Sequence, residues 1–168
     1  MLKQIRGRWK RKGSVHSADL LPVDPATLQL THGGNVEIFD FFKRNSSWNA
    51  NVGMYDRLTR TDLAQGLDDL ITKTGIGGKS VKAETVYGRR IIANSNGLVF
   101  AWAAGTWDFF FRLPNERTDA ACRDGARLDL TYPPGWLNFY LLRLGDEWPA
   151  ILEHWFKISY QDSLNKDR

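Results

Sequence analysis

The stretch that decides the fold is residues 80–113, SVKAETVYGRRIIANSNGLVFAWAAGTWDFFFRL. It holds four short runs rich in β-branched and aromatic residues, which favour strands. The runs are residues 80–87, 89–93, 97–104 and 106–113. Their connectors are Gly88, the Asn-Ser-Asn-Gly sequence at 94–97 and Gly105, residue types that tolerate the positive φ of tight hairpins. We therefore predict an antiparallel meander of four strands.

Side-chain alternation in the last two runs predicts a single apolar face. Successive strand residues point to opposite sides, so residues two apart share a side. The apolar side is expected to carry Leu98, Phe100, Trp102, Trp107, Phe109 and Phe111. Phe110 falls on the other side with Asp108 and Arg112, where it is exposed unless the first 58 residues cover it.

Helical patterns flank the meander. Leu63, Leu67 and Leu70 predict a helix that begins at Thr59 or Thr61 and stops at Gly75. A short helix is predicted at 115–124, followed by strands at 126–132 and 136–144. A final helix is predicted with Asp146 as its N-cap. Its apolar stripe comprises Trp148, Ile151, Leu152, Trp155 and Ile158. The resulting fold class is α+β, in the order helix, four strands, helix, two strands, helix.

The first 58 residues have a weaker pattern. Residues 13–35 contain Pro22 and Pro25 and predict extended, irregular chain. Residues 35–44, NVEIFDFFKR, fit either a strand or a short amphipathic helix. We divide the chain into a basic tail (1–13), an irregular N-terminal extension (14–58) and an α+β domain (59–164).

Several short motifs within that domain occur in an order typical of one family. They are Val-Tyr-Gly-Arg at 86–89, Gly-Leu-Val-Phe-Ala at 97–101, Phe-Arg-Leu-Pro at 111–114, Asp-Gly-Ala at 124–126, a Pro-rich turn before Trp136, and a last helix that bears Trp155. In this order, residues 59–164 resemble the N-terminal domain of TfoX, the competence regulator, and its YjbR-type relatives. Arg89 and Val86 depart from that family's Met-Phe-Gly-Gly turn. The resemblance implies two layers, with helices packed on an antiparallel sheet, and a regulatory role without established catalytic residues.

The charge is unevenly distributed along the chain. Six of the 23 basic residues lie in the first twelve positions, with no acidic residue among them: Lys3, Arg6, Arg8, Lys10, Arg11 and Lys12. The other 17 oppose 19 acidic residues, so the remainder carries a net charge of −2. A basic segment with Trp9 inside it is able to neutralise phosphates and stack on a base, or to remain a solvated terminus.

No sequence motif has the complete residue pattern of a catalytic or metal-binding site. Residues 75–80, GIGGKS, imitate a P-loop, but Lys73 stands where its first glycine belongs, and a helix precedes where a strand is needed. His16, His32 and His154 have no metal-ligand spacing. Cys122 is expected to be a small buried residue. We therefore predict no catalytic residue, no metal and no cofactor.

The cysteine count and the absence of long apolar stretches indicate where the protein is expected in the cell. A single cysteine excludes an internal disulfide. Residues 1–12 are too charged for a signal peptide, and no stretch approaches the roughly 20 apolar residues of a membrane span. We therefore expect a cytoplasmic protein that does not act at a membrane.

Two binding roles stay open. The first is protein–protein interaction through a surface of aromatic and arginine side chains: Tyr87, Arg89, Arg90, Arg112 and Trp136. Burying an unpaired guanidinium is expensive and neighbouring strand residues face opposite sides, so at least one of the paired arginines is expected at the surface. The second role is nucleic-acid binding led by the tail, Lys3, Arg6, Arg8, Trp9, Lys10, Arg11 and Lys12, with help from Arg89 and Arg90.

Overall fold

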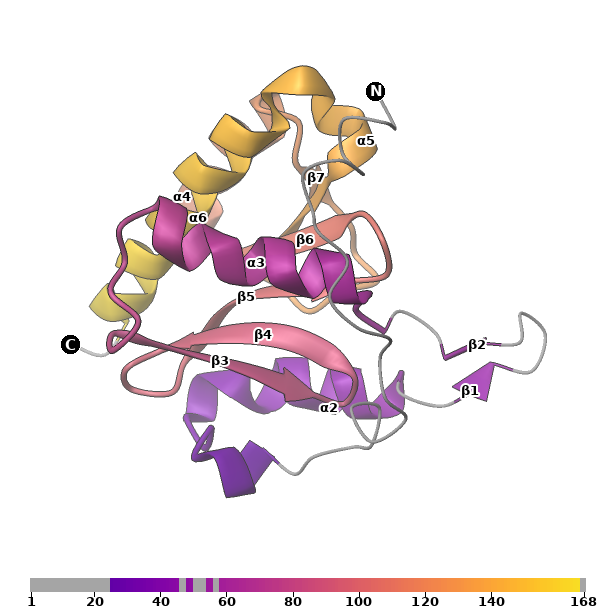
Figure 1. Ribbon diagram of the computed structural model, residues 1–168, viewed down its shortest axis with the longest axis vertical. Helices are drawn as coiled ribbons and strands as arrows, with labels where there is room; N and C mark the ends of the chain where they lie inside the picture. The colour runs from indigo at the N-terminus through magenta and orange to yellow at the C-terminus, as the bar shows by residue number, and fades with distance from the viewer. Residues whose placement is uncertain (1–24, 46–47, 50–53, 56–57, 167–168) are drawn as a thin grey trace.

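The computed structural model describes residues 25–45, 48–49, 54–55 and 58–166 (Figure 1). A six-stranded antiparallel sheet has the order β3-β4-β5-β6-β8-β7. Its strands are β3 (Val81–Val86), β4 (Arg89–Asn94), β5 (Val99–Ala104), β6 (Asp108–Arg112), β7 (Arg127–Leu128) and β8 (Trp136–Tyr140). A separate two-stranded sheet pairs β1 (Trp48–Asn49) with β2 (Met54–Tyr55).

Five α-helices accompany the strands in the described part of the chain. They are α2 (Val36–Arg44), α3 (Thr61–Lys73), α4 (Asn115–Arg123), α5 (Leu141–Leu144) and α6 (Trp148–Asn165). Short 3-10 turns occupy Pro25–Leu28, Gly33–Asn35 and Gly145–Glu147. The predicted α+β class, the antiparallel meander and the element order are confirmed. None of the helices in these described ranges is long and apolar enough to span a bilayer.

Some element boundaries differ from the prediction. The strand predicted at 136–144 ends at Tyr140, and its last four residues form α5. The strand predicted at 126–132 is reduced to β7. Asp146 lies in a 3-10 turn, so α6 begins only at Trp148 and has no side-chain cap. Local sequence alone did not distinguish the apolar run of a strand from the start of a helix.

One face of the sheet packs against α3 and α6. Its core combines Leu63, Leu67 and Leu70 of α3 with Leu152, Trp155 and Phe156 of α6, and with Phe100, Phe109 and Phe111 of the sheet. Trp155 is only 2% exposed, and its Nε1 donates a hydrogen bond to Asp124 Oδ2 at 2.9 Å. The predicted stripe of the last helix is therefore buried around Trp155.

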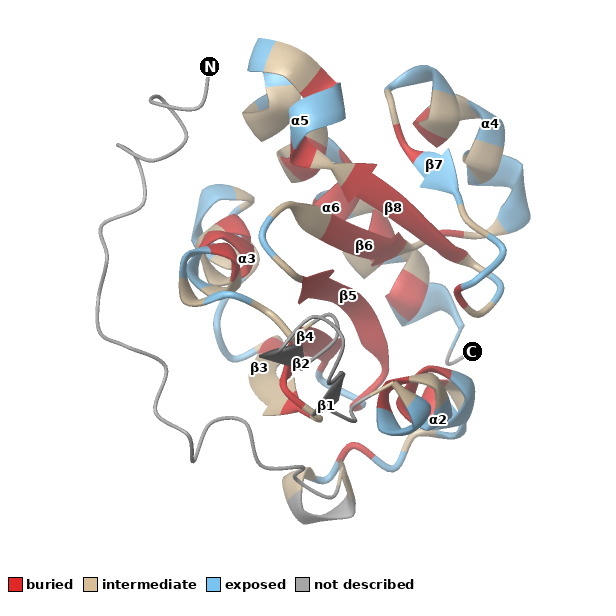
Figure 2. Cartoon of the chain, turned by 90° about the vertical axis from the view of Figure 1, so that its right-hand side faces the viewer, coloured by how far each residue is buried: buried red, intermediate tan, exposed pale blue. Residues whose placement is uncertain are grey.

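The opposite face is apolar as well, which corrects the prediction of a single apolar face. Trp102 and Phe110 stack there with ring centroids 3.9 Å apart, and Phe42 of α2 meets Trp102 edge-on at 4.8 Å. Phe110 is fully buried. The N-terminal segment forms the cover, since Leu30, Ile38, Phe39 and Phe42 belong to this second core. The two-layer arrangement thus gains a third layer, and Figure 2 shows β5, β6 and β8 as the buried strands at the centre.

A bulge explains why alternation failed on β5. Ile92 pairs with Ala101, but the next residue, Ala93, pairs with Val99. Phe100 is therefore the extra residue of the strand, and it points to the α3 and α6 face while Trp102 points to the α2 face. A one-residue insertion reverses the side of every residue beyond it.

The β3–β4 hairpin turns through two residues with positive φ, Tyr87 at 48° and Gly88 at 73°. This is the backbone of a type I′ turn. The prediction that Gly88 needs positive φ is confirmed. A Cβ placed on Gly88 would overlap Leu58 Cδ2.

Gly88→Val is expected to lower the free energy of unfolding by about 2 kcal/mol or more, because it adds a left-handed β-branched residue and a steric overlap with Leu58. Gly77→Val is the control, since the nearest atom to its Cβ would be Ser80 Oγ at 3.9 Å. Urea denaturation measures both variants. Equal midpoints for the two would show that the turn tolerates a side chain.

Candidate functional site

The five side chains predicted to bind a partner do not form one continuous exposed surface, because Arg89 and Trp136 are buried while Tyr87, Arg90 and Arg112 are half-buried. Arg89 is fully buried, and Trp136 is 3% exposed and meets Trp102 edge-on. Arg90 makes a two-pronged ion pair with Asp68 of α3, with Nε–Oδ1 at 2.9 Å and Nη2–Oδ2 at 2.7 Å. The prediction that Arg89 and Trp136 lie on an exposed binding surface is wrong, because both side chains are buried in the fold.

Arg89 instead stabilises the C-terminus of α2. Its guanidinium donates to Phe42 O at 3.3 Å, to Asn45 O at 2.8 Å and to Tyr87 O at 3.1 Å, and lies 5.1 Å from the Phe42 ring centroid. The last carbonyls of a helix lack partners within the helix and carry partial negative charge. Arg89 donates to one of these carbonyls, Phe42 O, and to the C-cap carbonyl Asn45 O, so it links the end of α2 to the sheet.

Arg112 and Tyr87 both contact residues of the second core. Arg112 donates to Gly34 O at 3.0 Å and lies 5.9 Å from the Trp136 ring. Burial lowers the pKa of Arg112, and the charge of Glu37 opposes this shift. Tyr87 is half-buried against the second core. The predicted nucleic-acid residues, 3–12, lie outside the described residues.

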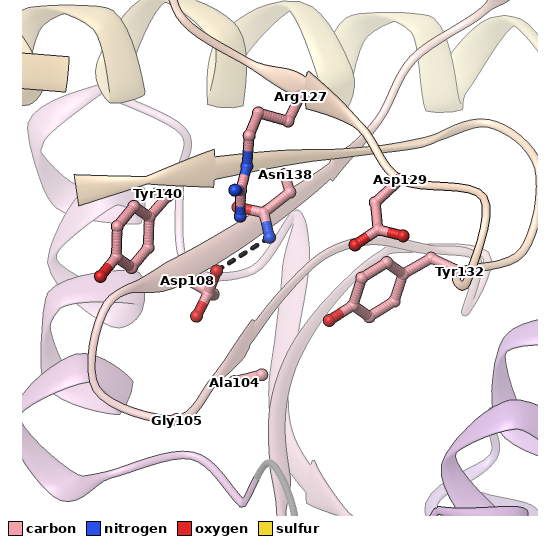
Figure 3. Close-up of a pocket in the computed structure, with 8 residues that line it drawn as sticks. All are labelled: Ala104, Gly105, Asp108, Arg127, Asp129, Tyr132, Asn138 and Tyr140. Carbon is pink, nitrogen blue, oxygen red and sulfur yellow. Dashed lines mark hydrogen bonds between the residues drawn. The ribbon is translucent and has the colours of Figure 1, made fainter. Parts of the chain in front are cut away.

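A polar pocket opens elsewhere, on the face of the sheet that α2 covers in part (Figure 3). Its volume is about 210 Å³. The lining residues come from the end of β5 and from β6, β7, β8 and the turn before β8: Ala104, Gly105, Asp108, Arg127, Asp129, Tyr132, Asn138 and Tyr140. Register brings them together, since Asp108 pairs with Tyr140 and Asn138 with Arg127.

Asn138 is the most unusual residue of this pocket. It is 2% exposed, and its Nδ2 donates to Asp108 Oδ1 at 2.8 Å. The ionised carboxylate can only accept, so this bond fixes the orientation of the amide. Asn138 Oδ1 is buried and accepts no hydrogen bond from the described residues. A buried acceptor without a donor is unfavourable, and such atoms often mark functional sites.

The remaining pocket groups are held in place by their neighbours. Asp129 Oδ1 accepts from Thr131 N at 2.9 Å and from Thr131 Oγ1 at 2.7 Å. Arg127 is exposed, and its guanidinium lies 5.4 Å from the Tyr140 ring centroid. Among the described residues that line the pocket, two carboxylates and one guanidinium sum to a net charge of −1.

The described part of the chain holds further chemistry-bearing residues outside this pocket. A wide cleft beside α4 and α6 is lined by Arg123, Arg143 and His154, together with Asp124, which already accepts from Trp155. Cys122 is half-buried rather than buried. Among the described residues, no group of three or more His, Cys, Asp or Glu could hold a metal ion.

Sequence reasoning missed the pocket, although one pattern pointed toward it. Asn138 interrupts the apolar run Trp-Leu-Asn-Phe-Tyr at 136–140, where a strand of this sheet is otherwise buried. Asp108 was expected to point away from the apolar side, and it does point away from the α3 and α6 core. The function of the pocket must be argued from its geometry, since no protein-family model, curated protein or solved structure shows significant similarity to this chain.

Proposed function

We propose that this chain is a binding module and that the pocket between β6, β7 and β8 takes a cationic side chain, an ammonium or guanidinium group, from a protein partner. Asn138 Oδ1 is the observation that carries the proposal, because a buried acceptor with no donor among the described residues favours a ligand that donates hydrogen bonds. Asp108 and Asp129 add negative charge beside it.

The size of the pocket supports a side chain over a cofactor. Sites for drug-sized ligands usually enclose about 300–1,000 Å³, and this pocket has about 210 Å³. A guanidinium or ammonium head with a few methylene groups is of the appropriate size. A side chain inserted by a partner protein therefore fits better than a free nucleotide or coenzyme.

The two tyrosines of the pocket favour a positively charged ligand. Tyr132 and Tyr140 line the pocket, and the face of an aromatic ring attracts positive charge. The guanidinium of Arg127 already makes such a cation–π contact with the Tyr140 ring. Arg127 belongs to the two-residue strand β7 and is exposed, so an entering cation can take over its position on the ring.

Asp108→Asn is expected to weaken binding of a lysine- or arginine-bearing peptide at least tenfold, because a hydrogen bond to a charged group contributes about 1.5–3 kcal/mol. Asparagine keeps an acceptor for Asn138, so the fold should survive. Arg127→Gln should strengthen the same binding, since it removes a competing cation. Titration calorimetry against a peptide library selects the ligand and measures the affinities.

Asp119→Asn provides the matched control, since it removes the same charge from an exposed position of α4 outside the pocket. Peptides in which norleucine or citrulline replaces the cationic residue should bind poorly. A preference for acidic peptides, or equal affinities for Asp108→Asn and Asp119→Asn, would refute the proposal.

The resemblance to the TfoX N-terminal type belongs to the same proposal. The element order of residues 59–164 supports it, and a regulatory role through a protein partner is what it implies. A cytoplasmic location is proposed with it, since a lone cysteine suits a reducing compartment.

Nucleic-acid binding is a second candidate, and the separation of charge favours it: +6 within the first twelve residues against −2 in the remainder. Deleting residues 1–12 should then abolish most nucleic-acid affinity and leave thermal unfolding unchanged. The affinity of the full chain should fall steeply with salt, with a logarithmic slope of about 0.7–0.9 per neutralised phosphate. Fluorescence anisotropy with labelled DNA and RNA tests this. Unaltered binding by the truncated chain, or no binding by either form, would exclude the tail.

A further inference from the structure

Strand β3 forms one end of the large sheet, and in the described part of the chain it pairs only with β4 (Figure 1). An edge strand presents unpaired N–H and C=O groups that can pair with another chain. β3 is six residues long, Val81–Val86, and carries two opposite charges, Lys82 and Glu84. Neither charge forms an ion pair with the described residues.

The register identifies which backbone groups face outward. Val86 and Arg89 flank the two-residue turn, so they form a hydrogen-bonded pair. Hydrogen-bonded and non-hydrogen-bonded pairs alternate along the two strands, so the backbone N–H and C=O groups of Lys82, Glu84 and Val86 bond to β4. The N–H and C=O groups of Val81, Ala83 and Thr85 therefore point away from the sheet. The assignment agrees with Arg90, opposite Thr85, whose N–H donates away from β3 to Thr59 Oγ1 at 2.9 Å.

We infer that β3 pairs with β3 of a second copy of this chain, antiparallel and centred on Ala83. In this register Ala83 faces its own counterpart and Val81 faces the partner's Thr85, so all outward backbone groups are bonded. Lys82 then faces the partner's Glu84 in a non-bonded pair, where side chains come closest. The two-fold axis produces this ion pair twice.

The charges distinguish this register from its neighbours. Centring the pair on Glu84 would place two carboxylates opposite each other, and centring it on Lys82 would do the same with two ammonium groups. Like charges directly opposite each other destabilise a strand pair. Charged residues on an edge usually discourage pairing. Here the alternation of sign makes the edge complementary to itself.

The size of the contact determines the kind of dimer. Stable interfaces bury about 1,200–2,000 Å², and a contact along one six-residue strand is expected to bury less. The dimer should therefore be in concentration-dependent equilibrium with the monomer, which sedimentation equilibrium measures on the full chain.

Charge reversal tests the register. Lys82→Glu and Glu84→Lys should each raise the dimer dissociation constant about tenfold or more, because each opposes like charges at both pairs. The double variant K82E/E84K should restore wild-type association. An equimolar mixture of the two single variants should form a heterodimer, because the acidic edge of one faces the basic edge of the other.

Ala83→Pro tests the backbone contribution. Proline removes an N–H that points outward, a position where an edge strand tolerates it, so the monomer should keep its fold by circular dichroism while the dimer is lost. A wild-type chain that stays monomeric up to its solubility limit would overturn the inference. Dimerisation that survives Ala83→Pro, or single variants that do not associate on mixing, would overturn it as well.

Discussion

Replacing Trp155 with alanine should lower the free energy of unfolding by about 3–5 kcal/mol, the usual range for truncating a core aromatic residue. Trp155 is 2% exposed in the core that α6 shares with the sheet, and its ring centroid lies 6.3 Å from that of Phe139. The substitution also leaves Asp124 Oδ2 without the indole donor at 2.9 Å. Urea denaturation followed by far-UV circular dichroism measures the loss.

Two further variants separate the causes. Trp155→Phe keeps most of the apolar volume and removes only the donor, so it should have a smaller effect than alanine. Lys157 lies on the exposed side of the same helix, so Lys157→Ala should change the free energy of unfolding by no more than about 0.5 kcal/mol. A wild-type midpoint for Trp155→Ala would mean that α6 is not part of the core.

The second large effect is expected at Arg89. Arg89→Met keeps a long apolar side chain but removes the donors to Phe42 O and Asn45 O and the charge at the C-terminus of α2. A hydrogen bond from a charged donor contributes about 1.5–3 kcal/mol, and a cation at a partly buried helix C-terminus contributes up to about 2 kcal/mol. We expect a total loss of about 3 kcal/mol, measured by urea denaturation.

The neighbouring arginine is the control. Arg90 bonds to Asp68 with both side chains partly exposed, 23% and 30%, and such pairs contribute about 0–1 kcal/mol. Arg90→Met should therefore destabilise far less than Arg89→Met. Equal losses for the two variants would contradict the assignment of Arg89 to α2.

Local patterns predicted most of the fold. The meander, the helix of Leu63, Leu67 and Leu70 and the burial of Trp155 follow from periodicity within single elements, which hydrophobic spacing reports directly. The second apolar face was missed because it depends on two features that periodicity does not report. One is the bulge at Phe100. The other is α2, whose local sequence fits a strand or a helix equally well and whose apolar side chains are buried only by packing against the sheet.

The candidate site was predicted less well for a related reason. Successive strand residues do face opposite sides, so Arg89 and Arg90 were correctly separated. Arg89 is nevertheless buried, because its acceptors come from residues 44 and 47 positions earlier in the chain. Asn138 and Asp108 are likewise 30 positions apart and meet only through the pairing of β6 with β8. Such partners cannot be inferred from local sequence.

The side-chain amide of Asn138 reports most directly on the proposed site. In a ¹⁵N–¹H spectrum its NH₂ resonances should shift on titration with methylguanidinium, together with the backbone amides of Asp108 and Tyr140. Acetate at equal concentration should leave them in place, and Asp108→Asn should abolish the response. Shifts caused by acetate, or methylguanidinium shifts confined to the cleft around His154, would contradict a cation site at Asn138.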